Sequence, residues 1–238
     1  MSIRAIFFDL FETLITEFAD GKRISNRQYD YMRLLGLSHA DFKLEWHKHH
    51  DARMRGEFAT FPEVIQAMVT SRSLLVDEKN IDSLYQDRVQ EKQMPFKQIH
   101  SEVLEMLRDL KNNSFRIGLI SNCTEEEVRG WRDSALGEYF DDVIFSYQVG
   151  MCKPDKDIYT LACNRLSVGP DECIFVGDGG SDELPGAAAA GLHVVHAVWF
   201  HSSIKSDFMK IDSPSKLIAA IEQMQQLAER DTDSTTPA

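Results

Sequence analysis

Four polar residues of this sequence each stand at the end of a run rich in Ile, Phe and Val: Asp9, Ser121, Asn122 and Asp178. Runs of this kind are typical of strands that are buried on both faces. Ligands of an open parallel sheet bind at the carboxyl ends of its strands. We therefore expect these four side chains to meet at one edge of a sheet, although a single carboxylate at a strand end often only caps a helix.

These groups supply the parts that phosphoryl transfer needs. A carboxylate such as Asp9 can attack phosphorus and form a covalent intermediate, which divides one difficult step into two easier ones. Because the attacking group and the phosphate are both negative, a cation must reduce their repulsion, and Mg²⁺ prefers carboxylate oxygens such as those of Asp9 and Asp178. Lys153, just ahead of a helical pattern, would add a compact positive charge, and Ser121 would donate a hydrogen bond to a phosphate oxygen.

The elements that must position these residues follow a strand–helix alternation. Strand-like runs lie at 3–10, 116–121, 142–146, 173–178 and 192–198. Helical patterns lie between them at 101–113, 124–136 and 155–166. Strand followed by helix, repeated, predicts an α/β fold with a Rossmann-like parallel sheet of five or six strands and helices on both faces.

The segment 16–93 has a different pattern, because helical periodicity and charge run through it with no buried strand. Its predicted helices lie at 29–37, 40–54, 61–69 and 80–90. We expect residues 1–15 and 94–228 to form the α/β core and residues 16–93 to form an inserted helical cap. The acidic segment 229–238 has few apolar residues and is expected to be disordered.

Composition limits the class of protein. The chain has 238 residues, 43% hydrophobic and 27% charged, as is ordinary for a soluble globular protein. Its formal net charge of −12 argues against a nucleic-acid binder. No apolar stretch is long enough to span a membrane, and the first residues lack a signal-peptide pattern. The four cysteines show no C-x-x-C spacing. We expect a cytoplasmic monomer or homodimer with reduced thiols.

Four motifs, FFDLFETL, LISN, CKPDKDIY and FVGDGGSDELPGA, resemble in order and spacing those of the haloacid dehalogenase (HAD) superfamily. The helical insert between the first two motifs is similar to the cap of its phosphatase and dehalogenase branch. The resemblance implies a hydrolase with Asp9 as nucleophile, Ser121 and Asn122 binding phosphate, and Lys153 balancing charge. It also implies Mg²⁺ as cofactor and a small phosphorylated metabolite as substrate.

The resemblance implies that Asp9 and Asp178 bind the metal directly, and the backbone carbonyl of Phe11 could still bind it. Asp182 would support the metal through water or through contacts with its ligands. Asp182 has the spacing of a GDG-x-x-D pattern, and Glu183, one residue later, is the alternative. The rest of the substrate would be recognised by the cap, where Arg23, Arg53 and Arg55 are candidate contacts.

One position departs from the family pattern. Phosphatases of the superfamily usually carry a second aspartate two residues after the nucleophile as general acid and base, and Phe11 stands there instead. Three interpretations follow. A phosphatase could use good leaving groups or recruit Glu12 as the acid. A 2-haloacid dehalogenase would form an aspartyl ester on Asp9 without metal. A binding protein on a HAD scaffold would not catalyse a reaction.

Overall fold

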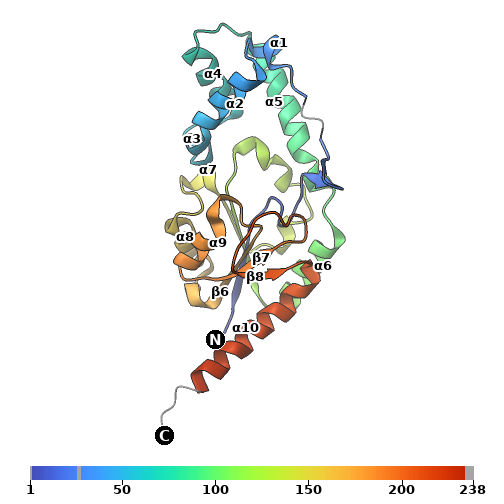
Figure 1. Ribbon diagram of the computed structural model, residues 1–238, viewed down its shortest axis with the longest axis vertical. Coiled ribbons are helices and arrows are strands. Elements are labelled where there is room, and N and C mark those ends of the chain that lie inside the picture. Colours follow the sequence, from blue (N-terminus) through green and yellow to red (C-terminus); the bar gives the residue numbers. More distant parts are fainter. Residues whose placement is uncertain (1, 26–27, 234–238) are drawn as a thin grey trace.

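The computed structural model describes residues 2–25 and 28–233, and these form an α/β core with a group of helices above it (Figure 1). Among them is a parallel sheet of six strands in the order β5-β4-β1-β6-β7-β8. The strands are β1 (Ala5–Phe8), β4 (Arg116–Ser121), β5 (Asp142–Phe145), β6 (Cys173–Gly177), β7 (His193–Ala197) and β8 (Met209–Ile211). The predicted Rossmann-like parallel sheet is therefore confirmed, and the short β8 is the strand that the sequence pattern did not reveal.

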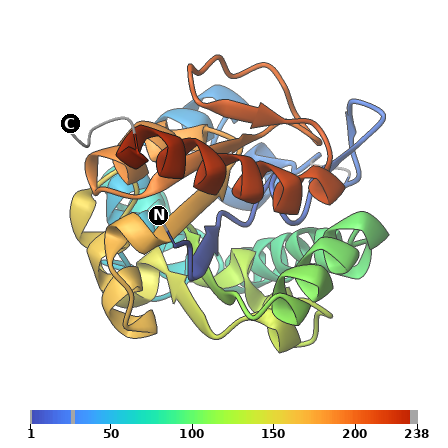
Figure 2. The ribbon, with the colours of Figure 1, turned by 90° about the horizontal axis from the view of Figure 1, so that it is seen from below.

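Helices cover both faces of the sheet (Figure 2). One face packs against α6 (Ser101–Asn112) and α10 (Leu217–Asp233), and the other against α8 (Lys156–Leu166) and α9 (Glu183–Ala189). Strand β1 shows the two-residue period behind this arrangement, because Ile6 and Phe8 belong to the first face while Ala5 and Phe7 belong to the second. A short helix, α7 (Ser146–Val149), follows β5.

The helices above the core come from the segment between β1 and β4. They are α1 (Tyr31–Leu35), α2 (His39–Lys48), α3 (His50–Met54), α4 (Phe61–Ser71) and α5 (Glu78–Gln93), preceded by the two-residue strands β2 (Phe18–Ala19) and β3 (Lys22–Arg23). They share a hydrophobic cluster of their own that includes Leu35, Ile65 and Leu84. We call residues 16–93 the helical insert. That it acts as a cap with these boundaries remains a prediction, which this separate cluster supports.

The predicted helix at 124–136 is wrong. The segment instead forms the short 3₁₀ turns η2 (Glu125–Glu127) and η3 (Arg129–Trp131), followed by η4 (Gly137–Tyr139). Gly130 explains part of the difference, because a Cβ atom there would lie 2.6 Å from a ring carbon of Phe96. The turn therefore packs closer to its neighbour than a helix with side chains on every residue would allow.

The expected disorder from residue 229 also differs from the structure, since α10 continues to Asp233. Once a helix has formed on the apolar contacts of Leu217 and Ile221, further polar residues add to it at little cost. Residues 234–238 lie outside the described residues. Within the described part of the chain, no helix combines the length and the apolar character needed to cross a bilayer.

Candidate active site

The sheet topology brings the predicted residues together. Strand β1 lies between β4 and β6 and is parallel to both, so Asp9, Ser121 and Asp178 stand at neighbouring carboxyl ends. Carboxylate oxygens of Asp9, Asp178 and Glu183 all lie within 4.8 Å of one another. This edge of the core faces the helical insert (Figure 1). The expected meeting of strand ends is therefore seen in the geometry.

Lys153 lies at the centre of this group. Its Nζ donates hydrogen bonds to Oδ1 of Asp9 and, at 2.5 Å, to Oε2 of Glu183. The lysine side chain is 2% exposed and that of Glu183 is also 2% exposed, so these ion pairs are shielded from water. One ammonium group thus compensates two buried carboxylates and fixes the orientation of Asp9.

Asn122 holds the loop that carries Lys153. Its Oδ1 accepts a hydrogen bond from the backbone N–H of Lys153, and its Nδ2 donates to the backbone carbonyl of the same residue, both at 2.8 Å. With its side chain engaged in this reciprocal pair, Asn122 positions Lys153. The direct substrate contact that we expected of Asn122 remains a prediction.

Ser121 offers an unused hydrogen-bonding group. It is fully buried, and its Oγ has no hydrogen-bond partner among the described residues. A buried hydroxyl without a partner is unfavourable, so a ligand atom that accepts its hydrogen would remove that cost. Thr13 Oγ1, in the turn after Asp9, is likewise buried and unpartnered, and sequence reasoning missed it although it lies inside the motif FFDLFETL.

Burial dominates the electrostatics of the site. It raises the pKa of Glu183 to about 8, helped by the charge on Asp9 and opposed by Lys153. Burial also raises the pKa of Asp9 above its ordinary value of 3.8, again against the effect of Lys153. Burial alone would lower the pKa of Lys153, but Asp9 and Glu183 outweigh it and raise that pKa. The lysine therefore stays charged beside two carboxyl groups whose pKa values are raised.

The three carboxylates form a donor set that fits Mg²⁺, a hard cation that binds oxygen ligands. Glu183 reaches the group because Gly177 has no side chain: a Cβ there would lie 2.1 Å from Oε1 of Glu183. Asp182, which we expected in this place, is exposed and lies outside the group. The left-handed backbone of Ser181 and Asp182 turns the chain so that the next residue points inward. The contribution of the Phe11 carbonyl remains a prediction.

Comparisons with known proteins agree with this geometry. The family model "haloacid dehalogenase-like hydrolase" matches residues 3–191 of the chain. The chain belongs to this family. It is an enzyme of the hydrolase class, as the motifs predicted.

Two curated relatives of this HAD-like hydrolase are phosphatases. A glyceraldehyde 3-phosphate phosphatase of Methanopyrus kandleri is 28% identical over 40% of this chain and 42% of its own length. Pyrophosphatase PpaX of Bacillus cereus is 28% identical over 52% of this chain and 60% of its own length. The match thus spans about half the length of these relatives.

Solved structures share the fold. A HAD phosphatase from Thermococcus onnurineus is 18% identical with a TM-score of 0.63, covering 92% of this chain and 98% of that chain. A 2-haloacid dehalogenase from Pseudomonas syringae pv. Tomato DC3000 is 20% identical with a TM-score of 0.62, covering 93% and 99%.

The HAD-like hydrolase has an unusual environment at the position of the missing aspartate. The ring of Phe11 packs against the core cluster and lies 5.2 Å from Nζ of Lys92 on α5. Lys92 is buried and pairs with Glu17 at 2.8 Å and Glu127 at 3.0 Å. An aromatic ring and a cation of the insert therefore occupy the place where a general acid would be expected.

Glu12 is tied to the adjoining turn. Its Oε2 accepts a hydrogen bond from Thr16 Oγ1 at 2.6 Å, and its Oε1 accepts one from the backbone N–H of Glu17 at 2.9 Å. Its backbone has a positive φ of 58°. Both oxygens thus stabilise the first residues of the insert, and the geometry gives the predicted acid role no support.

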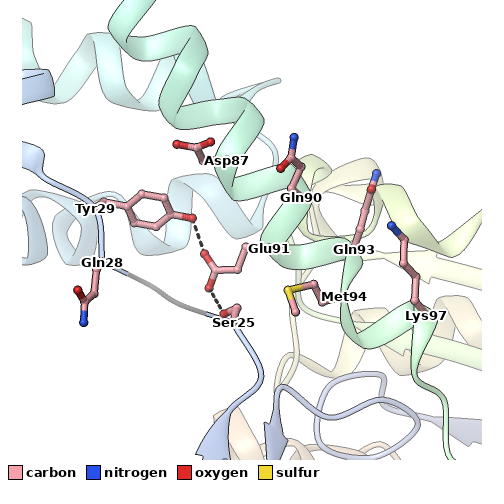
Figure 3. Close-up of a pocket in the computed structure, with 9 residues that line it drawn as sticks. All are labelled: Ser25, Gln28, Tyr29, Asp87, Gln90, Glu91, Gln93, Met94 and Lys97. Atoms are coloured by element: carbon pink, nitrogen blue, oxygen red, sulfur yellow. Dashed lines mark hydrogen bonds between the residues drawn. The ribbon is translucent and has the colours of Figure 1, made fainter.

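A large surface pocket of the HAD-like hydrolase, about 680 Å³, lies away from this site between α5 and the chain before α1 (Figure 3). Within it, Glu91 accepts hydrogen bonds from Tyr29 at 2.5 Å and Ser25 at 2.8 Å. None of the residues predicted to act in catalysis lines it. These bonds join the insert's first segment to α5.

Proposed function

We propose that the protein is a Mg²⁺-dependent phosphatase of a small phosphorylated metabolite and that its reaction forms an aspartyl-phosphate on Asp9. The observation that carries the proposal is the buried contact of Lys153 with Asp9 and Glu183 beside the unpartnered hydroxyl of Ser121. The glyceraldehyde 3-phosphate phosphatase and pyrophosphatase names of the relatives point to the same substrate class.

In the first step a carboxylate oxygen of Asp9 forms a bond to phosphorus while the bond from phosphorus to the substrate oxygen breaks. Lys153 orients the carboxylate and adds positive charge, and Ser121 donates a hydrogen bond to a phosphate oxygen. In the second step a water oxygen bonds to phosphorus, the bond to Asp9 breaks, and inorganic phosphate leaves.

Asp9, Asp178 and Glu183 would hold Mg²⁺, which supplies charge neutralisation of the phosphate when bound. With Phe11 in place of a carboxylic acid, the departing oxygen receives little proton help from the protein. General acid assistance is typically worth about 10²- to 10⁴-fold in rate. We therefore propose that the enzyme acts best on esters with stable leaving groups.

We also propose a reducing compartment such as the cytoplasm as its location. The four cysteines are all free and buried, and no pair of them is joined. Free thiols are the usual state of cysteines in reducing compartments.

The proposal is tested by hydrolysis of p-nitrophenyl phosphate with and without Mg²⁺, using the wild type and Asp9→Asn. We expect activity that requires the metal and is lost in the variant. Hydrolysis that persists in Asp9→Asn would show that Asp9 is not the nucleophile. Chloride release from 2-chloropropionate without metal would instead favour a dehalogenase, and no turnover across a panel of phosphate esters would favour a binding protein.

A further inference from the structure

A second cavity, of about 520 Å³, lies within the helical insert and is lined by residues from all five of its helices. Its described lining contains four cationic side chains, from Arg23, Lys43, Arg53 and Arg88, and no carboxylate. Arg23 and Arg88 are paired with carboxylates outside the lining, which leaves Lys43 and Arg53 without an ion pair among the described residues.

Arg53 is the buried cation of this lining that forms no ion pair among the described residues, although one of its Nη atoms donates a hydrogen bond to the backbone carbonyl of Trp46 at 3.4 Å. It is 3% exposed, and its Nε has no hydrogen-bond partner among the described residues, where it also forms no ion pair. Burial lowers its pKa to about 10, so the guanidinium stays charged at neutral pH. The nearest opposing charges, Glu126 and Glu127, are already paired with Arg88 at 2.8 and 2.9 Å. A buried, unpaired charge is costly, and an anionic ligand would remove that cost.

The two other candidate arginines of the insert differ from Arg53. Arg23 pairs with Glu17 at 2.6 Å, and Arg55 pairs with Asp155 of the core at 2.7 Å. Both are partly exposed. Arg53 alone among these three candidates is both buried and unpaired.

Flat aromatic rings form one wall of the cavity. Tyr31 and Phe42 stack with centroids 3.7 Å apart, and Phe42 stacks on Trp46 at 5.7 Å. Phe61 continues the row from Trp46 at 5.5 Å. The Arg53 guanidinium lies 3.6 Å from the ring centroid of Trp46, within this row. Such surfaces favour ligands with a planar, unsaturated body.

The Arg53 end of the cavity adjoins the core. Arg53 and Trp46 also line a narrow space together with Thr124 and Glu125, which follow the site residues Ser121 and Asn122 in sequence. The cavity therefore adjoins the segment of the core that follows the phosphate-site residues in sequence.

We propose that this cavity binds an organic anion with a planar body, and that Arg53 pairs with its carboxylate or phosphate group. Resting on the proposed function, this assigns the substrate to phosphate esters whose alcohol part is planar and carries a second anionic group. The aromatic wall would contact the planar body, while Arg53 would select for the charge.

Calorimetric titration with 2-naphthoate and its neutral analogue 2-naphthamide tests the site without requiring turnover. We expect the wild type to prefer the carboxylate, and Arg53→Met to weaken its binding about tenfold or more while leaving the amide unchanged. Arg53→Lys should retain part of the preference. Arg33→Met is the control, because Arg33 is an exposed insert arginine outside the cavity.

Equal binding of the two probes, no binding of either, or an unchanged preference in Arg53→Met would overturn the proposal.

Competition separates this proposal from the proposed function. In the wild type, 2-naphthoate should inhibit p-nitrophenyl phosphate hydrolysis competitively, and Arg53→Met should weaken that inhibition. Probe binding without phosphatase activity would defeat the proposed function but support the site. Phosphatase activity without probe binding would leave the function standing and defeat the site.

Discussion

At the scale of single residues, Lys153 decides how the site is charged. It contacts Asp9 and Glu183, and Asp178 adds a third carboxylate nearby. A divalent ion bound to these acids would favour their charged forms and would neutralise the negative charge that Lys153 does not compensate. Lys153 and the metal would therefore both reduce the repulsion between the carboxylates.

Removing the charge of Lys153 should affect both rate and stability. We expect Lys153→Met to lower kcat by about 10²- to 10³-fold, as loss of a charged stabilising group typically does. It should also destabilise the fold by about 3–5 kcal/mol, because buried carboxylates lose their partner. Mg²⁺ should restore part of this stability in a denaturant titration. A variant as active and as stable as the wild type would contradict the role of Lys153.

Glu183 and Asp182 make different predictions for metal binding. Glu183→Gln should weaken Mg²⁺ binding by about tenfold or more, since it removes one of the three carboxyl ligands. Asp182→Asn should leave it unchanged, because Asp182 is exposed and asparagine tolerates its left-handed backbone. The Mg²⁺ dependence of Tm measures both variants. A larger loss of Mg²⁺ binding in Asp182→Asn than in Glu183→Gln would show that Asp182 is the ligand.

Glu12 should matter to the turn rather than to proton transfer. Glu12→Gln weakens its hydrogen bonds to Thr16 and Glu17, with an expected cost of about 1 kcal/mol. We expect hydrolysis of phenyl phosphate and p-nitrophenyl phosphate to slow by the same factor. A selective loss with phenyl phosphate, the poorer leaving group, would show that Glu12 acts as the acid.

At the scale of elements, helix α5 joins the insert to the core through buried ion pairs. Arg88 binds Glu126 and Glu127, while Lys92 binds Glu127 and Glu17. Burial works to raise the pKa of Glu127, but Lys92 and Arg88 outweigh it and hold that pKa below its ordinary value of 4.5. Protonation of Glu127 should therefore make the stability of these contacts between α5 and the core depend on pH.

The sign of that coupling can be tested. A carboxyl group with a lowered folded-state pKa stabilises the fold above its unfolded pKa, and this contribution is lost as the pH falls further. The stability difference between the wild type and Glu127→Gln should thus shrink between about pH 7 and about pH 3.5, by about 1.4 kcal/mol for each unit below 4.5. Urea unfolding measures it. Asp212→Asn, in an exposed pair, should show little difference at either pH. A constant difference for Glu127 would contradict the coupling.

Strand ends were predictable because hydrophobic runs define buried strands and the parallel topology aligns their ends. That logic brought Asp9, Ser121 and Asp178 together from sequence. The sequence alone could not show whether Glu183 or Asp182 lies beside Asp9 and Asp178, because that depends on two residues with left-handed backbone in one turn. The unpaired state of Arg53 was equally hidden, since it depends on which acids the packing of α5 and η2 assigns to Arg88.

At the scale of the whole molecule, this acidic protein has two groups of positive charge that could contact an anionic substrate. One is Lys153 at the edge of the sheet, and the other is the cavity around Arg53 in the insert. The described helices of the insert stand above the carboxyl ends of the strands (Figure 1). This arrangement would direct an anionic substrate to the space between them and would repel anions elsewhere.

The central claim is that Asp9 becomes phosphorylated during turnover. The most direct measurement is the mass of the peptide containing Asp9 after acid quenching of wild-type enzyme mixed with p-nitrophenyl phosphate and Mg²⁺. We predict that this peptide carries the added mass of one phosphoryl group, and that the corresponding peptide of Asp9→Asn does not. Turnover with an unmodified Asp9 peptide, or with the phosphoryl group on another residue, would contradict the account.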